Sequence, residues 1–315
     1  MATINLAWYN LENLFEPGQH PEYGRSWTEN RYNRKVQHLA SVIADLHGGE
    51  GPDLLGVCEV QSERVLDDLI AALPNSGAYA VAHADSPDVR MIDVGFIYRP
   101  HVLSFVDATP YNIRKRYPTR DVLDVTFRVN ANDVRLHAVG NHWPSRSGGH
   151  YASEPYRILV AENVAWIVDG HYQEDPDANV VLMGDFNDDP FSRSVLEYLY
   201  AIRNKERVQA RRNSRTSRPY TYNLSWPLMH QSTPGSYHYS SEPDAWLMFD
   251  QIMVSKGLLT GRNGLEVRDE SMAIHRPPHI RQGAKPFKFR RKSDGSWWEG
   301  YSDHFPVTAV IDILE

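Results

Sequence analysis

Side chains that can bind a metal ion or transfer a proton recur where apolar runs of the sequence end. Asp185 and Asn187 follow VVLMG, Glu59 follows LLGVC, and His142 follows LHAVGN. If these runs are neighbouring strands, their ends form one carboxylate-rich rim. Oxygen ligands of this kind are typical of Mg²⁺ or Mn²⁺, which often share their coordination with a substrate phosphate. The other members of the set are Asn10 and Glu12 after INLAWY, Asp250 after LMF, and Asp303 with His304 before PVTAVIDI, a run that they reach through Phe305.

The spacing of the acidic residues after VVLMG first suggests a calcium loop. Asp185, Asn187 and Asp189 fall at positions 1, 3 and 5 of an EF-hand. That loop needs glycine at position 6 and a bidentate glutamate at position 12, where this chain has Pro190 and Leu196. The spacing therefore excludes an EF-hand.

Each of these residues, taken singly, also has a structural explanation. An Asp-x-Asn after a strand is commonly a turn, because both side chains satisfy backbone groups there. Glu59 could cap the following helix, His142 could be a half-buried histidine, and Asp303 with His304 could belong to a loop. We interpret residues 188–190 (Asp-Asp-Pro) as a turn that leads into a helix. It is the joint occurrence of the set, in this order, that favours a site.

Hydrophobic periodicity predicts the elements that must position these residues. The mixture of clustered strands and intervening helices favours sheets covered by helices over a simple βαβ array. Helices are predicted after Thr28, after Ser62, from Ser153 to the glycine at 170, and over 192–202. Strands are predicted at TINLAWYN (3–10), DLLGVCEV (53–60), YAVAH (79–83), VGFIYR (94–99), LDVTFRV (123–129), VRLHAVG (134–140), NVVLMGDF (179–186), FDQIMVS (249–255) and FPVTAVIDI (305–313).

The whole chain, 1–315, is predicted to be a single domain, because it shows no repeat and no low-complexity linker. Irregular basic stretches near 203–247 and 257–300 are expected to be surface insertions. Several catalytic motifs are missing: G-x-G-x-x-G after the first strand, a Walker A loop, H-E-x-x-H, a Cys/His zinc cluster and G-x-S-x-G. Their absence argues against nucleotide-cofactor enzymes, zincins and serine hydrolases.

Composition describes an ordinary globular protein with local basic runs. Apolar residues make up 41% and charged residues 23% of the chain, and the formal net charge is −7. Three runs, 114–120, 203–218 and 285–292, are nevertheless basic. Any one of them could be a solvated loop, but three such runs in an acidic protein favour a phosphate-rich substrate. The single Cys58, the lack of a signal-peptide pattern and the lack of a membrane-spanning run predict a cytoplasmic protein.

Six motifs together resemble the endonuclease/exonuclease/phosphatase superfamily, which includes DNase I: YNLEN, GVCEVQ, GNHWPSR, MGDFND, FDQIMVS and YSDHFPV. They extend from Asn10 to His304 and so cover nearly the whole chain. The resemblance implies a four-layer α/β sandwich, in which two packed mixed β-sheets are flanked by helices. It also implies divalent-metal phosphoester hydrolysis.

The resemblance implies a role for each matching residue. Glu59 matches the principal Mg²⁺ ligand, Asn10 and Asp303 match further residues of the metal site, and Glu12 is a less direct match to a metal-side aspartate. Asp185 and Asn187 match the pair that positions water and holds phosphate. His304 and Asp250 match a paired histidine and aspartate, and His142 matches the second histidine. Substrate binding is assigned to Arg99, Arg120 and Arg157. Gln251 departs from the pattern, because many nucleases have arginine there.

A metal-dependent nuclease or phosphodiesterase that cleaves DNA or RNA is the leading interpretation. Mg²⁺ is the expected cofactor, with Mn²⁺ and Ca²⁺ as alternatives. A phosphatase or phosphodiesterase of lipid, inositol or other small phosphate esters would use the same residues. A non-catalytic binding protein is the third alternative, and the loss of a core motif residue would favour it. No core motif residue is lost.

Overall fold

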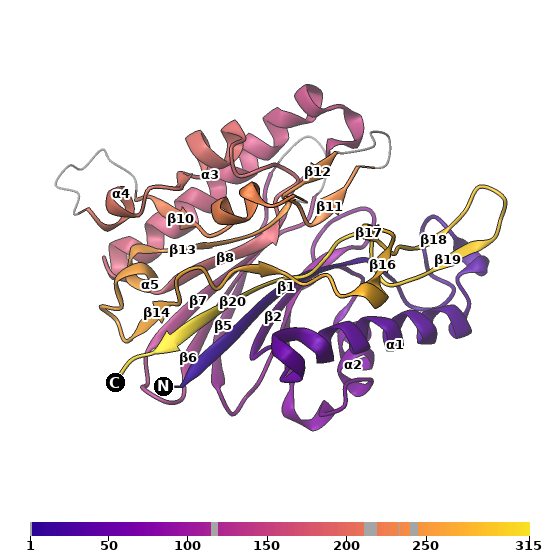
Figure 1. Ribbon diagram of the computed structural model, residues 1–315, viewed down its shortest axis with the longest axis horizontal. Helices are drawn as coiled ribbons and strands as arrows, with labels where there is room; N and C mark the ends of the chain where they lie inside the picture. Colours follow the sequence, from indigo (N-terminus) through magenta and orange to yellow (C-terminus); the bar gives the residue numbers. More distant parts are fainter. Residues whose placement is uncertain (1, 115–118, 211–218, 233, 240–244) are drawn as a thin grey trace.

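The computed structural model describes residues 2–114, 119–210, 219–232, 234–239 and 245–315, and it consists of two β-sheets packed face to face with helices on the outside (Figure 1). Both sheets contain parallel and antiparallel pairs. The predicted four-layer α/β sandwich is therefore confirmed. In the described residues no helix is both long and apolar enough to cross a membrane.

The first sheet has β1 near its centre. Trp8 of this strand packs between the two sheets, whereas Tyr9 packs toward the helices, and most residues of the strand are buried. β1 pairs in parallel with β2 and antiparallel with β20. The strand order is β14 (Leu265–Val267), β20 (Val307–Ile313), β1 (Thr3–Leu14), β2 (Leu54–Val60), β4 (Asp93–Tyr98) and β3 (Ala80–His83), with β15 (Ala273–Ile274) also paired to β20.

The second sheet has β8 near its centre. β7 and β8 run in parallel, whereas β13 pairs antiparallel with β8. The order is β5 (Leu103–Tyr111), β6 (Val122–Val129), β7 (Arg135–His142), β8 (Val180–Asp185), β13 (Asp250–Val254), β10 (Thr221–Asn223) and β9 (Ala201–Ile202).

Helices cover the outer face of each sheet. α1 (Glu29–Asp45) and α2 (Glu63–Ala71) pack on the first sheet, and α3 (His150–Glu174) packs on the second. Shorter helices are α4 (Lys205–Gln209), α5 (Lys256–Thr260) and a π-helical turn, Ser194–Tyr198. Single 3₁₀ turns are Gly24–Ser26, Leu46–Gly49, Ser76–Ala78, Arg146–Gly148, Trp226–His230 and Pro278–Ile280.

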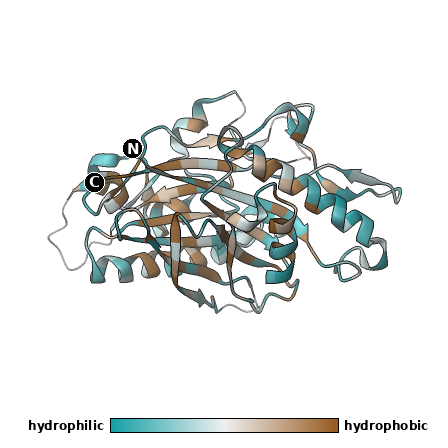
Figure 2. Cartoon of the chain, turned by 90° about the horizontal axis from the view of Figure 1, so that it is seen from below, coloured by the Kyte–Doolittle hydropathy of each residue, from teal (hydrophilic) through white to brown (hydrophobic). Residues whose placement is uncertain are grey.

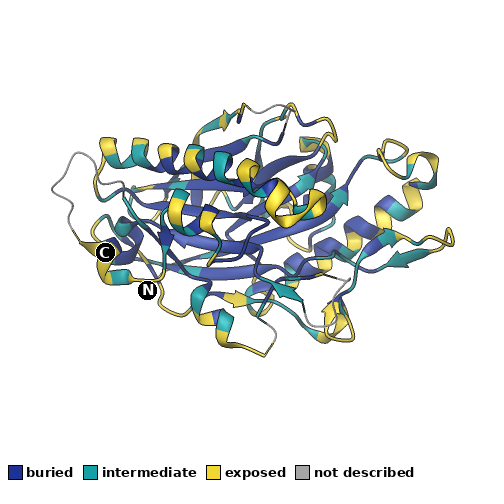
Figure 3. Ribbon diagram, turned by 90° about the horizontal axis from the view of Figure 1, so that it is seen from above, coloured by how far each residue is buried: buried dark blue, intermediate teal, exposed yellow. Residues whose placement is uncertain are grey.

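Three apolar layers hold the sandwich together. The central layer lies between the two sheets and contains Trp8, Phe96 and Phe127. One further layer lies under α1 and α2, and another under α3. The strands are accordingly apolar and buried, whereas the helices turn hydrophilic, exposed faces outward (Figures 2 and 3). Each fully buried large side chain in these layers contributes about 1.5–3 kcal/mol relative to its exposed state.

Small hairpins extend the sandwich at the end where β1 and β8 finish (Figure 1). They come mainly from the stretch 257–300 and carry part of its basic run. The pairs are β11 (Tyr237–His238) with β12 (Trp246–Leu247), β16 (Arg281–Gln282) with β17 (Lys285–Pro286), and β18 (Phe289–Arg291) with β19 (Trp297–Glu299).

The structure differs from the predicted elements in four places. β5 was not predicted, because most of its side chains are exposed and show no apolar alternation. α3 continues past Gly170, where a helix end was expected. The predicted helix over 192–202 shrinks to the π-helical turn and β9. The two stretches expected as surface insertions contribute β10, β14 and β15 to the main sheets. Residues 211–218 of one basic run and 115–118 of another lie outside the described residues.

Candidate active site

Strand register brings the predicted residues to one end of the sandwich. In the first sheet, Asn10 of β1 lies opposite Cys58 of β2, the residue before Glu59. In the second sheet, Asp185 of β8 lies opposite both His142 of β7 and Asp250 of β13. The end shared by these strands therefore carries side chains from both sheets.

The Asn10 amide joins the two sheets. Its Nδ2 donates to Glu59 Oε1 at 3.3 Å and to Asp185 Oδ2 at 3.1 Å, and Asn10 itself is fully buried. His142 Nε2 lies 3.6 Å from Glu59 Oε1 and 3.9 Å from Asp185 Oδ2. These four side chains form a compact group in which two carboxylates share an amide and an imidazole.

His304 also lies beside Asp185 and is held by Asp250. Its Nδ1 lies 2.6 Å from Asp250 Oδ2, which also accepts a hydrogen bond of 2.6 Å from Ser236 Oγ. His304 Nε2 is directed toward Asp185 Oδ2 at 3.8 Å. Ser302 Oγ donates to the backbone oxygen of Asn10 at 2.7 Å and so anchors the segment that carries His304 to β1.

The pKa values of the two histidines, His142 and His304, are shifted in opposite directions. Burial lowers the pKa of His142 well below its usual value, and the charge of Arg120 adds to the effect. Arg120 Nε donates to His142 Nδ1 at 3.3 Å, which leaves the proton of the neutral ring on Nε2. Burial would also lower the pKa of His304, but Asp250 and Asp185 outweigh it and raise that pKa well above its usual value. Environments that separate two like groups in this way are typical of an acid–base pair.

Burial of Asp185 raises its pKa to about 7, an effect that the charge of His304 opposes. Its Oδ1 accepts a hydrogen bond of 3.0 Å from the backbone N–H of Asn187. The Asn187 amide in turn donates to the backbone oxygen of Trp143 at 3.0 Å, and this contact ties the ends of β7 and β8 together. Asn187 thus holds both the Asp185 carboxylate and the loop that follows β8.

Three of the predicted site residues have a left-handed backbone. Glu12, Glu59 and Asn187 have φ values of 50°, 62° and 49°. Non-glycine residues in this region cost of order 1 kcal/mol or more, and they cluster at functional sites because surrounding structure holds them there. Glu12 and Glu59 lie where the pairing register of β1 and β2 shifts, and Asn187 follows the end of β8.

A second group of charges lies beside the first. Glu12 Oε2 accepts from the backbone N–H of Phe289 at 2.7 Å, and its Oε1 lies 3.6 Å from Arg290 Nε. Burial and the nearby charge of Asp303 raise the pKa of Glu12 to about 8. The buried Lys35 ammonium donates to the backbone oxygen of Glu12. Asp303 itself is half-buried at this position.

The donor atoms at this end suit a hard divalent cation. Glu59, Asp185 and Asp303 provide carboxylates and Asn10 an amide, the ligands that Mg²⁺ and Mn²⁺ prefer. A softer set is also close, because the potential ligand atoms of Cys58, His142 and Asp185 lie within 4.8 Å of one another. Burial raises the pKa of the Cys58 thiol well above its usual value, so it remains a protonated thiol and a weak ligand. The oxygen set therefore fits better.

The three arginines assigned to substrate binding occupy different places. Arg120 contacts His142 and lies at the group, although its side chain is buried. Arg99 lies at the opposite end of β2 and β4, where its guanidinium pairs with Asp53 at 2.9 Å and donates to Tyr79. Arg157 is fully buried and pairs with Asp188 at 2.7 Å. Because neither Arg99 nor Arg157 is presented at the site, their assignment to substrate binding is not retained.

Asp188 and Asp189, interpreted from the sequence as a simple turn, form an ion-pair network beneath the site. Arg146 donates to Asp188 Oδ1 at 2.8 Å and to Asp189 Oδ2 at 3.0 Å, and both carboxylates are buried. Gln251, which departs from the expected arginine, is fully buried and donates to the backbone oxygen of Asp188 at 2.6 Å. These residues hold the loop that carries Asn187.

The sequence also carries signals for the supporting residues, although these residues lie outside the strand-end pattern. Arg146 lies in the same GNHWPSR motif as His142, and Ser302 directly precedes Asp303. Lys35 occupies the apolar face of α1 between Tyr32 and Leu39, where an unpaired lysine would be costly. A charged residue at a buried helix position thus indicated a polar partner.

Comparison with known protein families gives a match over nearly the whole chain. The family model described as "Endonuclease/Exonuclease/phosphatase family" matches residues 5–313. No curated protein gives a significant match.

Solved structures resemble this chain over almost its whole length. An endonuclease/exonuclease/phosphatase family protein from Bacteroides thetaiotaomicron is 14% identical, with 98% of each chain covered and a TM-score of 0.61. The human Nocturnin catalytic domain with bound sulfate anion is 13% identical, with 99% of this chain and 94% of that chain covered and a TM-score of 0.61. A Bacteroides thetaiotaomicron mannosyl-6-phosphatase is 14% identical, with 98% and 100% covered and a TM-score of 0.61. At these identities the likeness shows the fold.

Proposed function

We propose that this chain, which belongs to the endonuclease/exonuclease/phosphatase family, hydrolyses phosphodiester bonds of DNA or RNA with the help of a divalent metal ion. Members of this family are hydrolases of phosphoesters. The observation that carries the proposal is the group at one end of the sandwich, in which Asn10 links Glu59 to Asp185 and the two histidines flank them.

Glu59, Asn10 and Asp303 are the residues proposed to hold the ion, with Glu12 beside them. The oxygen donor set favours Mg²⁺, with Mn²⁺ or Ca²⁺ as substitutes. When bound, the ion supplies charge neutralisation to a phosphate oxygen. The gathering of carboxylate oxygens at this end, where Glu59 and Asp185 share the Asn10 amide, supports such an ion.

The side chains around the phosphate have separate proposed roles. Asp185 accepts a hydrogen bond from the attacking water and takes its proton, a role supported by its burial between His304 and Asn10. His304, kept cationic by Asp250, stabilises charge on the phosphate and returns a proton to the leaving oxygen. His142 is neutral with its proton on Nε2, and this N–H donates a hydrogen bond to the phosphate. Asn187 keeps Asp185 oriented.

Nucleic acid is the proposed substrate because basic residues lie at the same end as the site. The hairpins β16–β17 and β18–β19 project there and carry much of the run 285–292 (Figure 1). Arg290 on β18 reaches Glu12 while 40% of its side chain stays exposed. Basic side chains interleaved with aromatic ones suit the phosphates and bases of a nucleic acid strand.

Variants of Asp185 and His304 test the proposal. Asp185→Asn and His304→Gln should each lower kcat on bis-p-nitrophenyl phosphate and on DNA by about 100-fold or more, the effect of losing one general acid or base. The matched controls are Asp67→Asn and His101→Gln, two exposed positions away from the site, which should keep wild-type rates. Full Mg²⁺-dependent activity in folded Asp185→Asn and His304→Gln would refute the assignment.

A substrate panel separates nucleic acid from the alternative of a small phosphate ester. Plasmid, single-stranded DNA, RNA, bis-p-nitrophenyl phosphate, p-nitrophenyl phosphate and inositol phosphates are offered with Mg²⁺, Mn²⁺ or Ca²⁺. Cleavage of nucleic acid supports the proposal. Hydrolysis of monoesters alone would show a phosphatase that uses the same residues.

A further inference from the structure

A second group of possible metal ligands lies under α3, at the other end of the second sheet. Asp124 comes from β6, His137 from β7 and His171 from α3, and their potential ligand atoms lie within 4.8 Å of one another. His137 precedes His142 by five residues on β7, which places it about 17 Å from the candidate active site at the usual strand rise. The two groups are therefore separate.

The three side chains lie close to one another. His171 Nε2 lies 2.7 Å from Asp124 Oδ2, and the two imidazole rings have their centroids 4.0 Å apart. Thr126 Oγ1 lies 3.0 Å from His137 Nδ1, a contact that orients this ring and leaves Nε2 without a hydrogen-bond partner among the described residues. Such a contact to the far ring nitrogen is what metal-bound histidines typically make.

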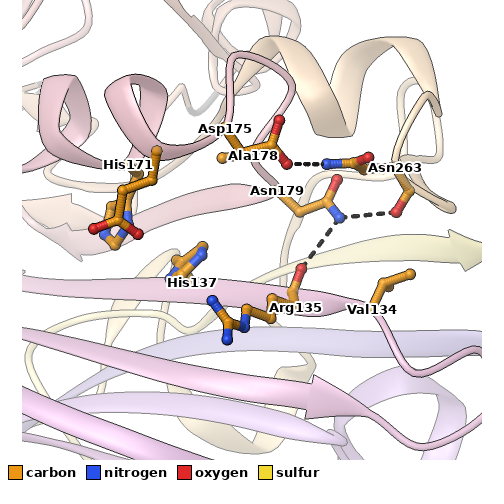
Figure 4. A pocket seen from close by; sticks show the side chains of 9 residues that line it. Val134, Arg135, His137, His171, Asp175, Ala178, Asn179 and Asn263 are labelled. Carbon is orange, nitrogen blue, oxygen red and sulfur yellow. Dashed lines mark hydrogen bonds between the residues drawn. The ribbon is translucent and has the colours of Figure 1, made fainter.

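Unsatisfied buried oxygens and a cavity accompany this group. Asp124 is 6% exposed, yet its Oδ1 has no hydrogen-bond partner in the described part of the chain. A cavity of about 300 Å³ borders the two histidines and is lined by Glu174 as well, among others. Figure 4 shows His171 on the helix and His137 on the strand below it, both at this cavity. Asn179, which also lines it, likewise has an unpartnered Oδ1.

We propose that Asp124, His137 and His171 bind a transition-metal ion of the Zn²⁺ class. Two imidazoles and one carboxylate form a donor set suited to Zn²⁺, Co²⁺ or Ni²⁺, in contrast to the oxygen donors around Glu59. Glu174 follows His171 by three residues on α3 and is placed to supply a further oxygen. An ion at this point would satisfy the orphan oxygen of Asp124.

Such an ion would join α3 to the sheet beneath it. His171 is near the last turn of α3, whereas Asp124 and His137 belong to adjacent strands. The other end of α3 carries Arg157, which pairs with Asp188 under the candidate active site. The ion would therefore stabilise the helix that supports the active-site loop without itself contacting substrate.

Zinc titration of the metal-stripped full chain tests this proposal. Glu59→Gln disables the oxygen set, and Asp124→Asn, His137→Gln and His171→Gln each disable the group under α3. Wild type and Glu59→Gln should bind Zn²⁺ with equal affinity at this group, and the melting temperature of both should rise by at least about 3 °C at saturating Zn²⁺. The three ligand variants should bind Zn²⁺ at least about 10-fold more weakly and show no such rise.

Asp124→Asn preserves the shape of the side chain and guards against loss of folding as the cause, and circular dichroism without metal checks each variant. His101→Gln, an exposed histidine, should bind Zn²⁺ like wild type. Calorimetry that finds no Zn²⁺ binding by wild type would overturn the proposal. So would binding that is lost in Glu59→Gln but unchanged in His171→Gln, because the ion would then occupy the active site.

Discussion

Replacing Arg157 with alanine should destabilise the protein strongly and leave KM for substrate almost unchanged. Its guanidinium is fully buried, pairs with Asp188 at 2.7 Å, and donates to Ser153 Oγ at 2.7 Å and to the backbone oxygen of His150 at 3.0 Å. The truncation would leave Asp188, which is 1% exposed, with Arg146 as its remaining cationic partner.

The expected magnitude follows from these contacts. Removing one partner of a buried ion pair costs about 3–5 kcal/mol, because the other charge stays buried without full compensation. At about 2.1 cal/mol/K of unfolding entropy per residue, a chain of 315 residues loses about 1.5 °C for each kcal/mol. The melting temperature should therefore fall by about 5–8 °C. The effect on kcat should be smaller than the effect on stability, because kcat depends only on how far the loop that carries Asn187 is displaced.

Thermal denaturation followed by circular dichroism measures the stability, and hydrolysis of bis-p-nitrophenyl phosphate well below the transition measures kcat and KM. Arg193→Ala is the matched control. That side chain is 56% exposed and pairs with Glu197, so its loss should leave the melting temperature close to that of wild type. An Arg157→Ala protein that melts like wild type but has a KM raised tenfold would show that Arg157 binds substrate.

Three further outcomes are expected. Chelation by EDTA should abolish activity, and added Mg²⁺ should restore it in a rate assay, whereas undiminished activity in excess EDTA would contradict the metal proposal. Gly184→Ala should lower both melting temperature and kcat, because the new Cβ would lie 2.5 Å from Asn141 Cβ, an overpacking that costs about 1–3 kcal/mol. His20 Nδ1 accepts hydrogen bonds from the backbone N–H groups of Glu22 and Tyr23. Burial lowers the pKa of His20 from 6.5 to about 3. Between these two pH values the unfolded chain therefore binds more protons than the folded chain. The stabilisation by His20 is complete above about pH 6.5 and is lost as the pH falls toward 3; His20→Gln should therefore lose less melting temperature than wild type between pH 7 and pH 5.

The layers of the fold and the strand-end residues could be predicted because both depend on local patterns. Apolar alternation locates β1 and β20, and a continuous apolar run locates β8. The polar residues at the ends of these runs can then be read from the sequence. The structure brings Asn10, Glu59 and Asp185 together as expected, although their roles stay predictions. The family resemblance is confirmed by the match to residues 5–313.

Features that depend on tertiary contacts could not be predicted from the sequence. The exposed strand β5 has no periodic apolar signal, and its position is fixed by hydrogen bonds to β6. Arg99 and Arg157 look alike as basic residues near motifs, but only the fold shows that one lies at the far end of β4 and the other under the loop. Asp188 is polar and follows a strand, as a turn residue would, yet two buried or half-buried arginines surround it.

The pairing of β1 with β20 has a consequence for the kinetics of folding. Thr3 lies opposite Asp312, so the centre of the first sheet joins the two ends of the described chain. Contacts of such high sequence separation form slowly, because loop-closure entropy is lost before they stabilise the chain. β20 begins three residues after His304, and β1 carries Asn10. We therefore expect refolding to regain activity only in its slowest phase, after most of the helical signal has returned.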